Sequence, residues 1–261
     1  MILETIVQST RRRVAQKKAQ KPLAQIREEA YAIDNSLRFS FEAALAQEGI
    51  NFICELKKAS PSQGIIASPY PYRQIAREYE QAGAAAISIL TEPDYFLGDD
   101  RYLMEVQKTV SVPLLRKDFT IDEYQIYEAK TLGASAVLLI ASLLDGSAIQ
   151  DYIVLCDELG LSALVETHDL REVDAVLKSG ARIVGVNNRN LRDFSVDINN
   201  ALRLRKMVPD TVLFVAESGI KTAADVARLR EAGVNGILIG ETLMRSSDKS
   251  QTLKTLRGRR P

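Results

Sequence analysis

Side chains that bind zinc or form disulfides are scarce in this sequence. Among 261 residues there is one histidine, His168, and there are two cysteines, Cys54 and Cys156, which lie in apolar surroundings without a pairing pattern. A zinc site built from Cys and His ligands cannot be assembled from these residues. We therefore expect no metal, and we interpret both cysteines as buried thiols of a protein in a reducing compartment.

Long apolar runs and an excess of one charge are missing as well. No run approaches the roughly 20 apolar residues of a membrane-spanning helix, and the N-terminus carries charge where a signal peptide has its apolar core. Lys and Arg together number 34, as do Asp and Glu, which gives no general attraction to nucleic acid or acidic membranes. We expect a cytoplasmic protein, a monomer or weak homo-oligomer, that binds neither nucleic acid nor membranes.

Short apolar runs alternate with amphipathic segments of helical spacing beyond residue 48. Eight runs cover residues 51–56, 85–90, 112–115, 134–140, 161–165, 182–186, 212–216 and 235–239. Strands that are apolar throughout and separated by helices are typical of a parallel sheet covered by helices. The sequence therefore predicts eight parallel strands, each followed by a helix.

An internal repeat indicates how these units are arranged. A helix end, a glycine and a strand start recur around Gly83, Gly133, Gly180 and Gly233, at spacings of 50, 47 and 53 residues. A period of about 50 residues fits two strand–helix units, so four copies imply eight units. This favours an α/β fold of the (β/α)8 TIM barrel type; a doubly wound open sheet is also compatible but gives no reason for four even copies.

Length and composition agree with one such barrel. Roughly 250 residues is the usual size of a (β/α)8 barrel, and 46% hydrophobic with 26% charged residues is an ordinary globular composition. We expect residues 1–261 to form a single domain, with residues 1–48 as an N-terminal helical extension. The run Arg11-Arg12-Arg13 in this extension is typical of a solvated helix face.

Polar side chains follow almost every apolar run at its carboxyl end. They are Glu55, Lys57, Thr91, Glu92, Lys117, Asp118, Glu166, Asn187, Arg189, Glu217 and Ser218. The active site of a (β/α)8 barrel forms at this end of its strands, and the strand starts carry no such set. Glu55 and Lys57 point the same way because side chains alternate along a strand, and a core rejects such a pair unless it is matched or used. The pattern predicts an enzyme site.

Lys117 and Glu166 are the candidates for proton transfer. Lys117 extends a strand beyond its apolar part, where a structural ion pair with a neighbouring glutamate is equally compatible with the sequence. Beside Lys57 and a carboxylate, Lys117 becomes a candidate general acid whose pKa depends on burial and ion pairing. Glu166 likewise ends an apolar run, where carboxylates often titrate high enough to transfer protons. We interpret His168 as a loop or helix-entry residue without a recognisable partner.

Two further features suggest the two ends of a ligand. Glycines in Glu217-Ser218-Gly219 and in Ile239-Gly240 expose backbone N–H groups at neighbouring turns, where such barrels bind phosphate, although tight turns alone would also explain them. Apolar residues that could hold a flat ring gather at the predicted mouth, namely Phe96, Phe119, Leu138 and Leu191. A substrate with an aromatic end and a phosphate end would suit both features.

Over its whole length the chain resembles the indole-3-glycerol phosphate synthases, enzymes of tryptophan biosynthesis. The resemblance depends on Glu55-x-Lys57-x-x-Ser60-Pro61-Ser62, Lys117-Asp118-Phe119, Glu166, Asn187-Asn188-Arg189, Glu217-Ser218-Gly219 and Ile239-Gly240, in the family's order and spacing. It implies conversion of 1-(2-carboxyphenylamino)-1-deoxyribulose 5-phosphate to indole-3-glycerol phosphate with loss of carbon dioxide and water, and without a cofactor.

The resemblance also implies roles for individual residues. Lys117 would protonate the ketose carbonyl, Lys57 would hold the benzoate carboxylate and share the acid role, and Glu166 would serve in the dehydration. The remaining roles are orientation by Glu55, Asn187 and Glu217, phosphate binding by Ser60, Ser218, Gly219 and Gly240, ring packing by Phe96, Phe119, Leu138 and Leu191, and a substrate contact by Arg189. The N-terminal helices would cover the catalytic face and exclude water.

Two other functions remain compatible with the residues alone. Lysines in a barrel mouth can form imines with ketose phosphates, so a Schiff-base aldolase is one alternative. A non-catalytic barrel used for assembly or metabolite sensing is the other, although the intact set of polar strand ends speaks against it.

Overall fold

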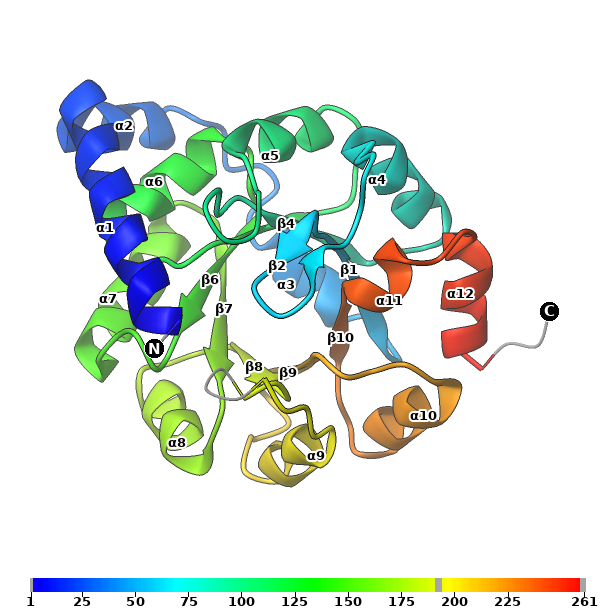
Figure 1. Ribbon diagram of the computed structural model, residues 1–261. Helices are drawn as coiled ribbons and strands as arrows, with labels where there is room; N and C mark the ends of the chain where they lie inside the picture. The colour runs from blue at the N-terminus through cyan, green and yellow to red at the C-terminus, as the bar shows by residue number, and fades with distance from the viewer. Residues whose placement is uncertain (1, 191–193, 259–261) are drawn as a thin grey trace.

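The computed structural model describes residues 2–190 and 194–258 and forms a closed barrel of parallel strands (Figure 1). Around the barrel the strand order is β1-β10-β9-β8-β7-β6-β5-β4. The strands are β1 (Asn51–Leu56), β4 (Ala86–Leu90), β5 (Leu114–Lys117), β6 (Ala136–Ile140), β7 (Ser162–Thr167), β8 (Ile183–Asn187), β9 (Leu213–Glu217) and β10 (Gly236–Ile239). The predicted (β/α)8 barrel is thus confirmed.

Helices form a ring outside the strands (Figure 1). In chain order they are α4 (Tyr72–Gln81), α5 (Asp100–Gln107), α6 (Glu123–Thr131), α7 (Gly146–Glu158), α8 (Leu170–Lys178), α9 (Asn199–Arg205), α10 (Ala223–Glu231) and α12 (Lys249–Leu256), with the short α11 (Glu241–Met244) before the last. The four repeat glycines follow α4, α6, α8 and α10 with positive φ, as the predicted helix ends require. No helix in the described ranges is long and apolar enough to span a membrane.

The barrel has two apolar layers because strand side chains alternate between its interior and its helices. Along β1, Ile53 belongs to the layer inside the barrel, whereas Phe52 and Cys54 pack against the surrounding helices. Cys54 and Cys156 are both buried free thiols, as expected. The apolar layer inside the barrel lies mainly toward the amino ends of the strands, and polar residues gather at the carboxyl ends.

The N-terminal extension consists of α1 (Ile2–Gln20), α2 (Leu23–Tyr31) and α3 (Ser40–Leu45). Figure 1 shows α1 and α2 beside α6. Phe41 and Leu45 of α3 join the apolar layer inside the barrel, and the backbone N–H of Glu42 donates to Ser162 Oγ at the start of β7. The extension therefore closes the amino end of the barrel through α3, while α1 lies along its outside.

Four strands extend further than the apolar runs predict. β5, β7, β8 and β9 continue to Lys117, Thr167, Asn187 and Glu217, and the ladder pairs Asn187 with Glu217. The backbone keeps its strand pairing while side chains become polar, because Lys117, Asn187 and Glu217 line the cavity at the mouth of the barrel and not its apolar layer. A strand that is assigned by hydrophobicity alone therefore ends too early.

The prediction of a solvated face for Arg11-Arg12-Arg13 is wrong at Arg13. Arg11 and Arg12 are exposed, but Arg13 Nη2 lies 2.7 Å from Asp118 Oδ1. Three and four residues from one another, Ile6, Ser9 and Arg13 share a helix face. That face is turned toward the barrel.

A short hairpin follows β1 at the carboxyl end of the barrel. Its strands β2 (Ala59–Ser60) and β3 (Gly64–Ile65) pair antiparallel, with Ser60 opposite Gly64. The Ser-Pro-Ser-x-Gly segment that ends the first apolar run is therefore folded over the mouth of the barrel, where Ser60, Pro61 and Ser62 line a cavity.

Candidate active site

A cavity of about 710 Å³ opens at the carboxyl ends of the barrel strands. It is lined by the residues to which the resemblance assigns roles: Glu55, Lys57, Ser60, Phe96, Lys117, Phe119, Leu138, Glu166, Asn187, Arg189, Glu217, Ser218, Gly219 and Gly240. Thr91 and Glu92, the polar residues after the second apolar run, do not line it. Leu191, the remaining candidate, lies outside the described residues. The fold thus brings residues from all eight strands of the barrel, or from the loops that follow them, into one site.

Lys117 ends β5 and is held between two carboxylates. Its Nζ lies 3.0 Å from Glu166 Oε2 and 3.2 Å from Glu217 Oε2, at the ends of β7 and β9. Burial alone would lower the pKa of Lys117, but the charges of Glu166, Glu217 and Glu55 outweigh it and raise the pKa well above its ordinary value. The amine therefore holds its proton at neutral pH.

The two carboxylates beside Lys117 titrate differently. Burial alone would raise the pKa of Glu166, but the charges of Lys117 and His168 and hydrogen bonds from Lys117 and Asn187 bring it down to about 2. Burial raises the pKa of Glu217 to about 7 against the charge of Lys117, and the nearby Glu166 adds to the rise. The ammonium thus lies between an ionised carboxylate and one that titrates near neutrality.

Gly185 makes room for Glu217 on the neighbouring strand. A Cβ atom at Gly185 would lie 2.6 Å from Glu217 Oε1, which real Cβ contacts do not reach. Among the described residues this oxygen has no hydrogen-bond partner although it is buried. A buried carboxylate oxygen without a donor is costly, which agrees with the raised pKa of Glu217.

Glu55 and Lys57 form a second pair on the opposite wall. Lys57 Nζ lies 2.6 Å from Glu55 Oε1, and the side chain of Glu55 is 4% exposed against 20% for Lys57. A side chain at Gly240 would overlap the carboxylate of Glu55. The expectation that the two point the same way is confirmed, and Gly240 admits their pair to the cavity. We call Glu55, Lys57, Lys117, Glu166 and Glu217 the inner cluster.

His168 has partners that the sequence interpretation missed. Its Nδ1 lies 3.2 Å from Glu172 Oε2, and its Nε2 is 3.4 Å from Glu166 Oε1. Burial lowers its pKa, but the hydrogen bond to Glu172 and the charge of Glu166 outweigh burial and raise it. The spacing of four residues between His168 and Glu172 at a helix start was the available signal.

The turn after β9 lies at the cavity, which Ser218 and Gly219 line. Ser218 and Gly219 have φ of 66° and 80°, the left-handed region that a residue other than glycine seldom adopts. Asn188 Nδ2 donates to the Ser218 carbonyl, 3.1 Å away, and fixes this turn. Consecutive backbone N–H groups in such a turn can bind an anion.

Apolar side chains line the other part of the cavity. The rings of Phe96 and Phe119 lie 6.1 Å apart at 43°. Further apolar residues that sequence reasoning missed also line it, among them Ile2, Leu3, Ile6, Phe194 and Val196. The first three belong to α1, and their helical spacing gave no sign of what they would face.

A family model described as indole-3-glycerol phosphate synthase matches residues 3–256 of this chain. The chain belongs to the indole-3-glycerol phosphate synthase family. Its sequence is 54% identical over 258 residues to the indole-3-glycerol phosphate synthase of Ruminiclostridium cellulolyticum, covering 99% of each chain. It is 51% identical over 259 residues to that of Lacticaseibacillus paracasei, covering 99% of this chain and all of the relative.

More distant solved structures share the fold alone. 3-Hexulose-6-phosphate synthase from Salmonella typhimurium superposes with a TM-score of 0.65 at 14% identity, over 80% of this chain and 97% of that one. A mandelate oxidase variant superposes with a TM-score of 0.61, also at 14% identity, over 80% of this chain and 72% of that one. Both support the barrel assignment and say nothing of the chemistry.

Membership of the indole-3-glycerol phosphate synthase family decides among the activities that the residues alone left open. The protein is a carboxy-lyase of tryptophan biosynthesis, and neither a Schiff-base aldolase nor a non-catalytic barrel. In residues 2–190 and 194–258 no group of His, Cys, Asp and Glu side chains is arranged to hold a metal ion.

Proposed function

We propose that the inner cluster closes the indole ring of 1-(2-carboxyphenylamino)-1-deoxyribulose 5-phosphate, with Lys117 as the proton donor. The observation that carries this assignment is the position of Lys117 Nζ, 3.0 Å from Glu166 and 3.2 Å from Glu217 at the centre of the mouth. A charged amine at that place can give a proton to an oxygen that becomes negative during the reaction.

The cavity orients the substrate by its two chemically different ends. We place the aromatic ring against Phe96, Phe119 and Leu138, and the phosphate on the backbone of Ser218, Gly219 and Gly240 with the hydroxyl of Ser60. The contrast between this apolar wall and the positive-φ turn of Ser218 and Gly219 supports this orientation. Arg189 adds a cation near the phosphate end, although its Nη1 also donates to the Phe194 carbonyl.

Ring closure requires an electrophile strong enough to attract an aromatic carbon. The ring carbon that bears the carboxylate forms a bond with the ketose carbonyl carbon, while the carbonyl oxygen takes the proton of Lys117 and becomes a hydroxyl group. Lys57 holds the benzoate carboxylate and shares the acid role, and Glu55 fixes Lys57 at 2.6 Å. Holding both reacting carbons together supplies much of the acceleration.

Decarboxylation and dehydration complete the sequence. Loss of carbon dioxide returns its electron pair to the ring and restores aromaticity, so this step needs no electron-sink cofactor. The new hydroxyl group then takes a proton from Lys57 and leaves as water, and Glu166 accepts the proton that the carbon beside the ring nitrogen releases as the indole double bond forms. Once Lys117 has given up its proton, the cation that lowers the pKa of Glu166 is gone, and Glu166 becomes a stronger base.

Glu217 and Asn187 support these steps. Glu217 titrates near neutrality and is hydrogen-bonded to Lys117, so it can return a proton to the amine between turnovers. Asn187 Nδ2 lies 3.4 Å from Glu166 Oε1 and keeps this carboxylate turned into the cavity. Glu217 also lines the cavity, and we assign it to the orientation of a sugar hydroxyl group.

We infer that residues 1–261 form one barrel domain with residues 1–48 as an extension. Its first helix covers part of the catalytic face, because Ile2, Leu3 and Ile6 line the cavity, whereas α3 closes the amino end of the barrel. The two buried free thiols favour the reducing cytoplasm. The balanced charge gives no general attraction to nucleic acid, and we propose a monomer or weak homo-oligomer.

A fluorescence assay of the purified protein tests the activity. With 1-(2-carboxyphenylamino)-1-deoxyribulose 5-phosphate we expect indole fluorescence to rise together with one equivalent of carbon dioxide, without any added metal or coenzyme. Absence of product at high enzyme concentration would contradict the proposed function.

A further inference from the structure

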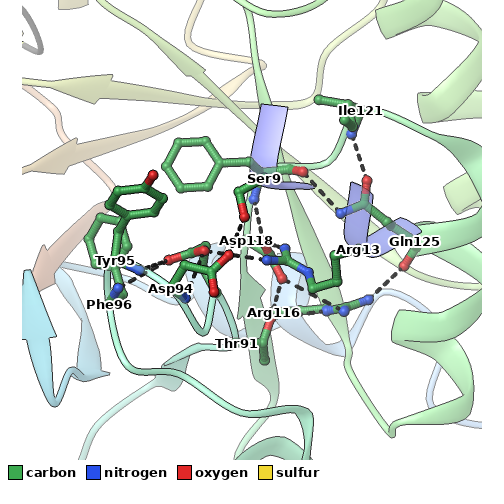
Figure 2. Close-up of polar contacts among 12 residues, drawn as sticks. Ser9, Arg13, Thr91, Asp94, Tyr95, Phe96, Arg116, Asp118, Ile121 and Gln125 are labelled. Atoms are coloured by element: carbon green, nitrogen blue, oxygen red, sulfur yellow. Dashed lines mark hydrogen bonds and ion pairs between the residues drawn. The ribbon is translucent and has the colours of Figure 1, made fainter. Parts of the chain in front are cut away.

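A second group of charges lies outside the barrel wall, between α1 and the loops that follow β4 and β5 (Figure 2). We call Arg13, Glu92, Asp100, Arg116, Asp118 and Glu128 the outer cluster. We propose that Arg13 is a positioning residue for the aromatic wall of the substrate cavity, and that it acts through Glu92 and Asp118. This inference rests on the proposed function insofar as Phe96 and Phe119 hold the substrate ring.

Glu92 connects Arg13 to the loop that carries Phe96. Its side chain is fully buried, and Arg13 Nη1 lies 3.3 Å from its Oε1. Its Oε2 accepts the backbone N–H groups of Tyr95 and Phe96, at 2.8 and 3.0 Å, and its Oε1 accepts that of Asp94 at 3.1 Å. One carboxylate therefore organises three consecutive backbone groups of the loop (Figure 2).

Asp118 connects the same guanidinium to Phe119. Its Oδ1 accepts a hydrogen bond from Arg13 Nη2 at 2.7 Å and from the backbone N–H of Phe119 at 2.8 Å. Its Oδ2 accepts the hydroxyl of Thr91 at 2.7 Å. Arg13 thus holds two carboxylates, each of which holds the backbone of one ring that lines the cavity.

Arg13 also joins this wall to the helix that completes it. The first turns of α1 give Ile2, Leu3 and Ile6 to the cavity lining. Ser9, one turn before Arg13, donates to Asp94 in the loop that Glu92 organises. The Arg13 guanidinium therefore fixes α1 and the loops after β4 and β5 together. These three segments carry the apolar lining of the cavity.

The charge and shape of an arginine matter at this position. Among the residues that the structure describes, Arg13 is the one cation that forms an ion pair with Glu92. Without it a buried carboxylate must take a proton or move, and either change weakens the bonds to the Phe96 loop. A planar guanidinium reaches both carboxylates with separate nitrogens, whereas the single ammonium of a lysine reaches one of them well.

The test compares Arg13→Met with two matched variants, Arg13→Lys and Arg12→Met. Arg12 precedes Arg13 on the same helix and is exposed, so Arg12→Met removes an equal charge without touching the outer cluster. Titration calorimetry measures two probes on each protein: 2-aminobenzoate, which has the aromatic end of the substrate, and inorganic phosphate, which has the other end. Thermal unfolding is followed in parallel.

We expect Arg13→Met to weaken 2-aminobenzoate binding by about 10-fold, an order of magnitude that one weakened anchor can produce, and to leave phosphate binding unchanged. Arg13→Lys should recover part of the loss, and Arg12→Met should match the wild type. Unchanged 2-aminobenzoate affinity in Arg13→Met would overturn the inference. So would equal loss for both probes, which indicates general destabilisation, or failure of the wild type to bind 2-aminobenzoate.

These measurements do not require turnover, so they separate the inference from the proposed function. A selective loss of 2-aminobenzoate binding in a wild type that makes no indole product would support the positioning role and contradict the activity. Normal indole synthesis with no selective loss would contradict the positioning role alone.

Discussion

Two clusters of buried charge lie back to back across β5, and they are built differently. Arg116 and Lys117 are neighbours on this strand, so their side chains point to opposite faces. Arg116 enters the outer cluster beneath α1, and Lys117 enters the inner cluster in the mouth of the barrel. One sequence position therefore separates a charge that holds the fold from a charge that we assign to chemistry.

In the outer cluster every nitrogen of the Arg116 guanidinium donates a hydrogen bond. Arg116 donates from Nε to Thr91 Oγ1, from Nη1 to the Gln125 carbonyl, and from Nη2 to Asp100 and Glu128. A guanidinium with every nitrogen engaged has one stable arrangement and is never deprotonated in proteins. Such a network fixes structure.

The inner cluster contains a hydrogen-bond acceptor that has no donor in the described part of the chain. Glu217 Oε1 has no hydrogen-bond partner among the described residues, and the pKa of Glu217 is raised to about 7 by burial. Its cations are lysines, which can lose a proton, and not arginines. Unsatisfied acceptors and groups that titrate near neutrality mark a site that exchanges protons with a substrate. If the two clusters also differ in role, substitutions in the inner cluster should lower turnover and substitutions in the outer cluster should lower stability.

The largest expected effect follows removal of the central amine of the inner cluster. Lys117→Ala should lower kcat by about 10⁴-fold, the upper range for loss of a general acid. The protein should stay folded and bind substrate, because Glu166 and Glu217 can take up a proton in place of the lost cation. Stopped-flow fluorescence gives kcat, and circular dichroism reports the fold. A near-normal kcat would show that another group donates the proton.

Removal of the base in the inner cluster should have the next largest effect. Glu166→Gln should lower kcat by about 10³-fold, with the defect after ring closure, because Lys117 still protonates the carbonyl. Rapid-quench single turnovers should therefore show an intermediate that has lost carbon dioxide but keeps the hydroxyl group. If no intermediate accumulates and ring closure itself is slowed, Glu166 acts at an earlier step than we propose.

The outer cluster should respond in stability and not in turnover. Arg116→Met removes the buried cation that Asp100 and Glu128 share. Lys17 still pairs with Glu128 but does not replace the hydrogen bonds of the guanidinium, so the free energy of unfolding should fall by about 3 kcal/mol. The kcat of the folded fraction should stay within about 10-fold of the wild type. Urea unfolding measures the first quantity, and Arg101→Met, at an exposed ion pair, is the matched control that should change little. A large loss of kcat without loss of stability would erase the contrast between the clusters.

The smallest expected effect is a change in the pH dependence of stability. Glu217 has a folded pKa of about 7, above its ordinary 4.5. Its contribution to stability is therefore fully present below about pH 4.5 and is lost as the pH rises through 7, by at most about 1.4 kcal/mol per pH unit.

Glu217→Gln should flatten this decline, because glutamine does not titrate. Urea unfolding of both proteins, at intervals of about one pH unit between about pH 5 and pH 8, measures the pH dependence of the free energy of unfolding. Identical slopes for wild type and variant would show that Glu217 is ionised throughout, and that the inner cluster is as fully satisfied as the outer one.

The sequence predicts the barrel and the inner cluster well because both depend on local pattern. Glycine stops and apolar runs recur along the chain, and polar residues at strand ends meet whenever parallel strands close into a barrel. Lys117, Glu166 and Glu217 could thus be placed together without knowledge of any distance. The strands were predicted too short for the same reason, because the apolar residues end where the polar residues of the site begin.

The outer cluster could not be predicted in the same way. Arg13 lies 79 residues from Glu92 and 105 from Asp118 in the sequence, and nothing in a run of three arginines distinguishes the one that turns inward. Glu92 and Asp118 were grouped with the other strand-end polar residues, although their carboxylates bind Arg13 and loop backbone. Packing of α1 against the barrel decides this, and it is a tertiary property.

The central claim is that the amine of Lys117 gives a proton and does not form a bond to the substrate. Loss of activity in Lys117→Ala fits both chemistries, so the direct measurement is mass spectrometry after treatment of enzyme and substrate with sodium borohydride. The account predicts peptides of unchanged mass at Lys117 and Lys57 and full activity after the reductant is removed. A peptide that carries the reduced substrate on Lys117 would contradict it.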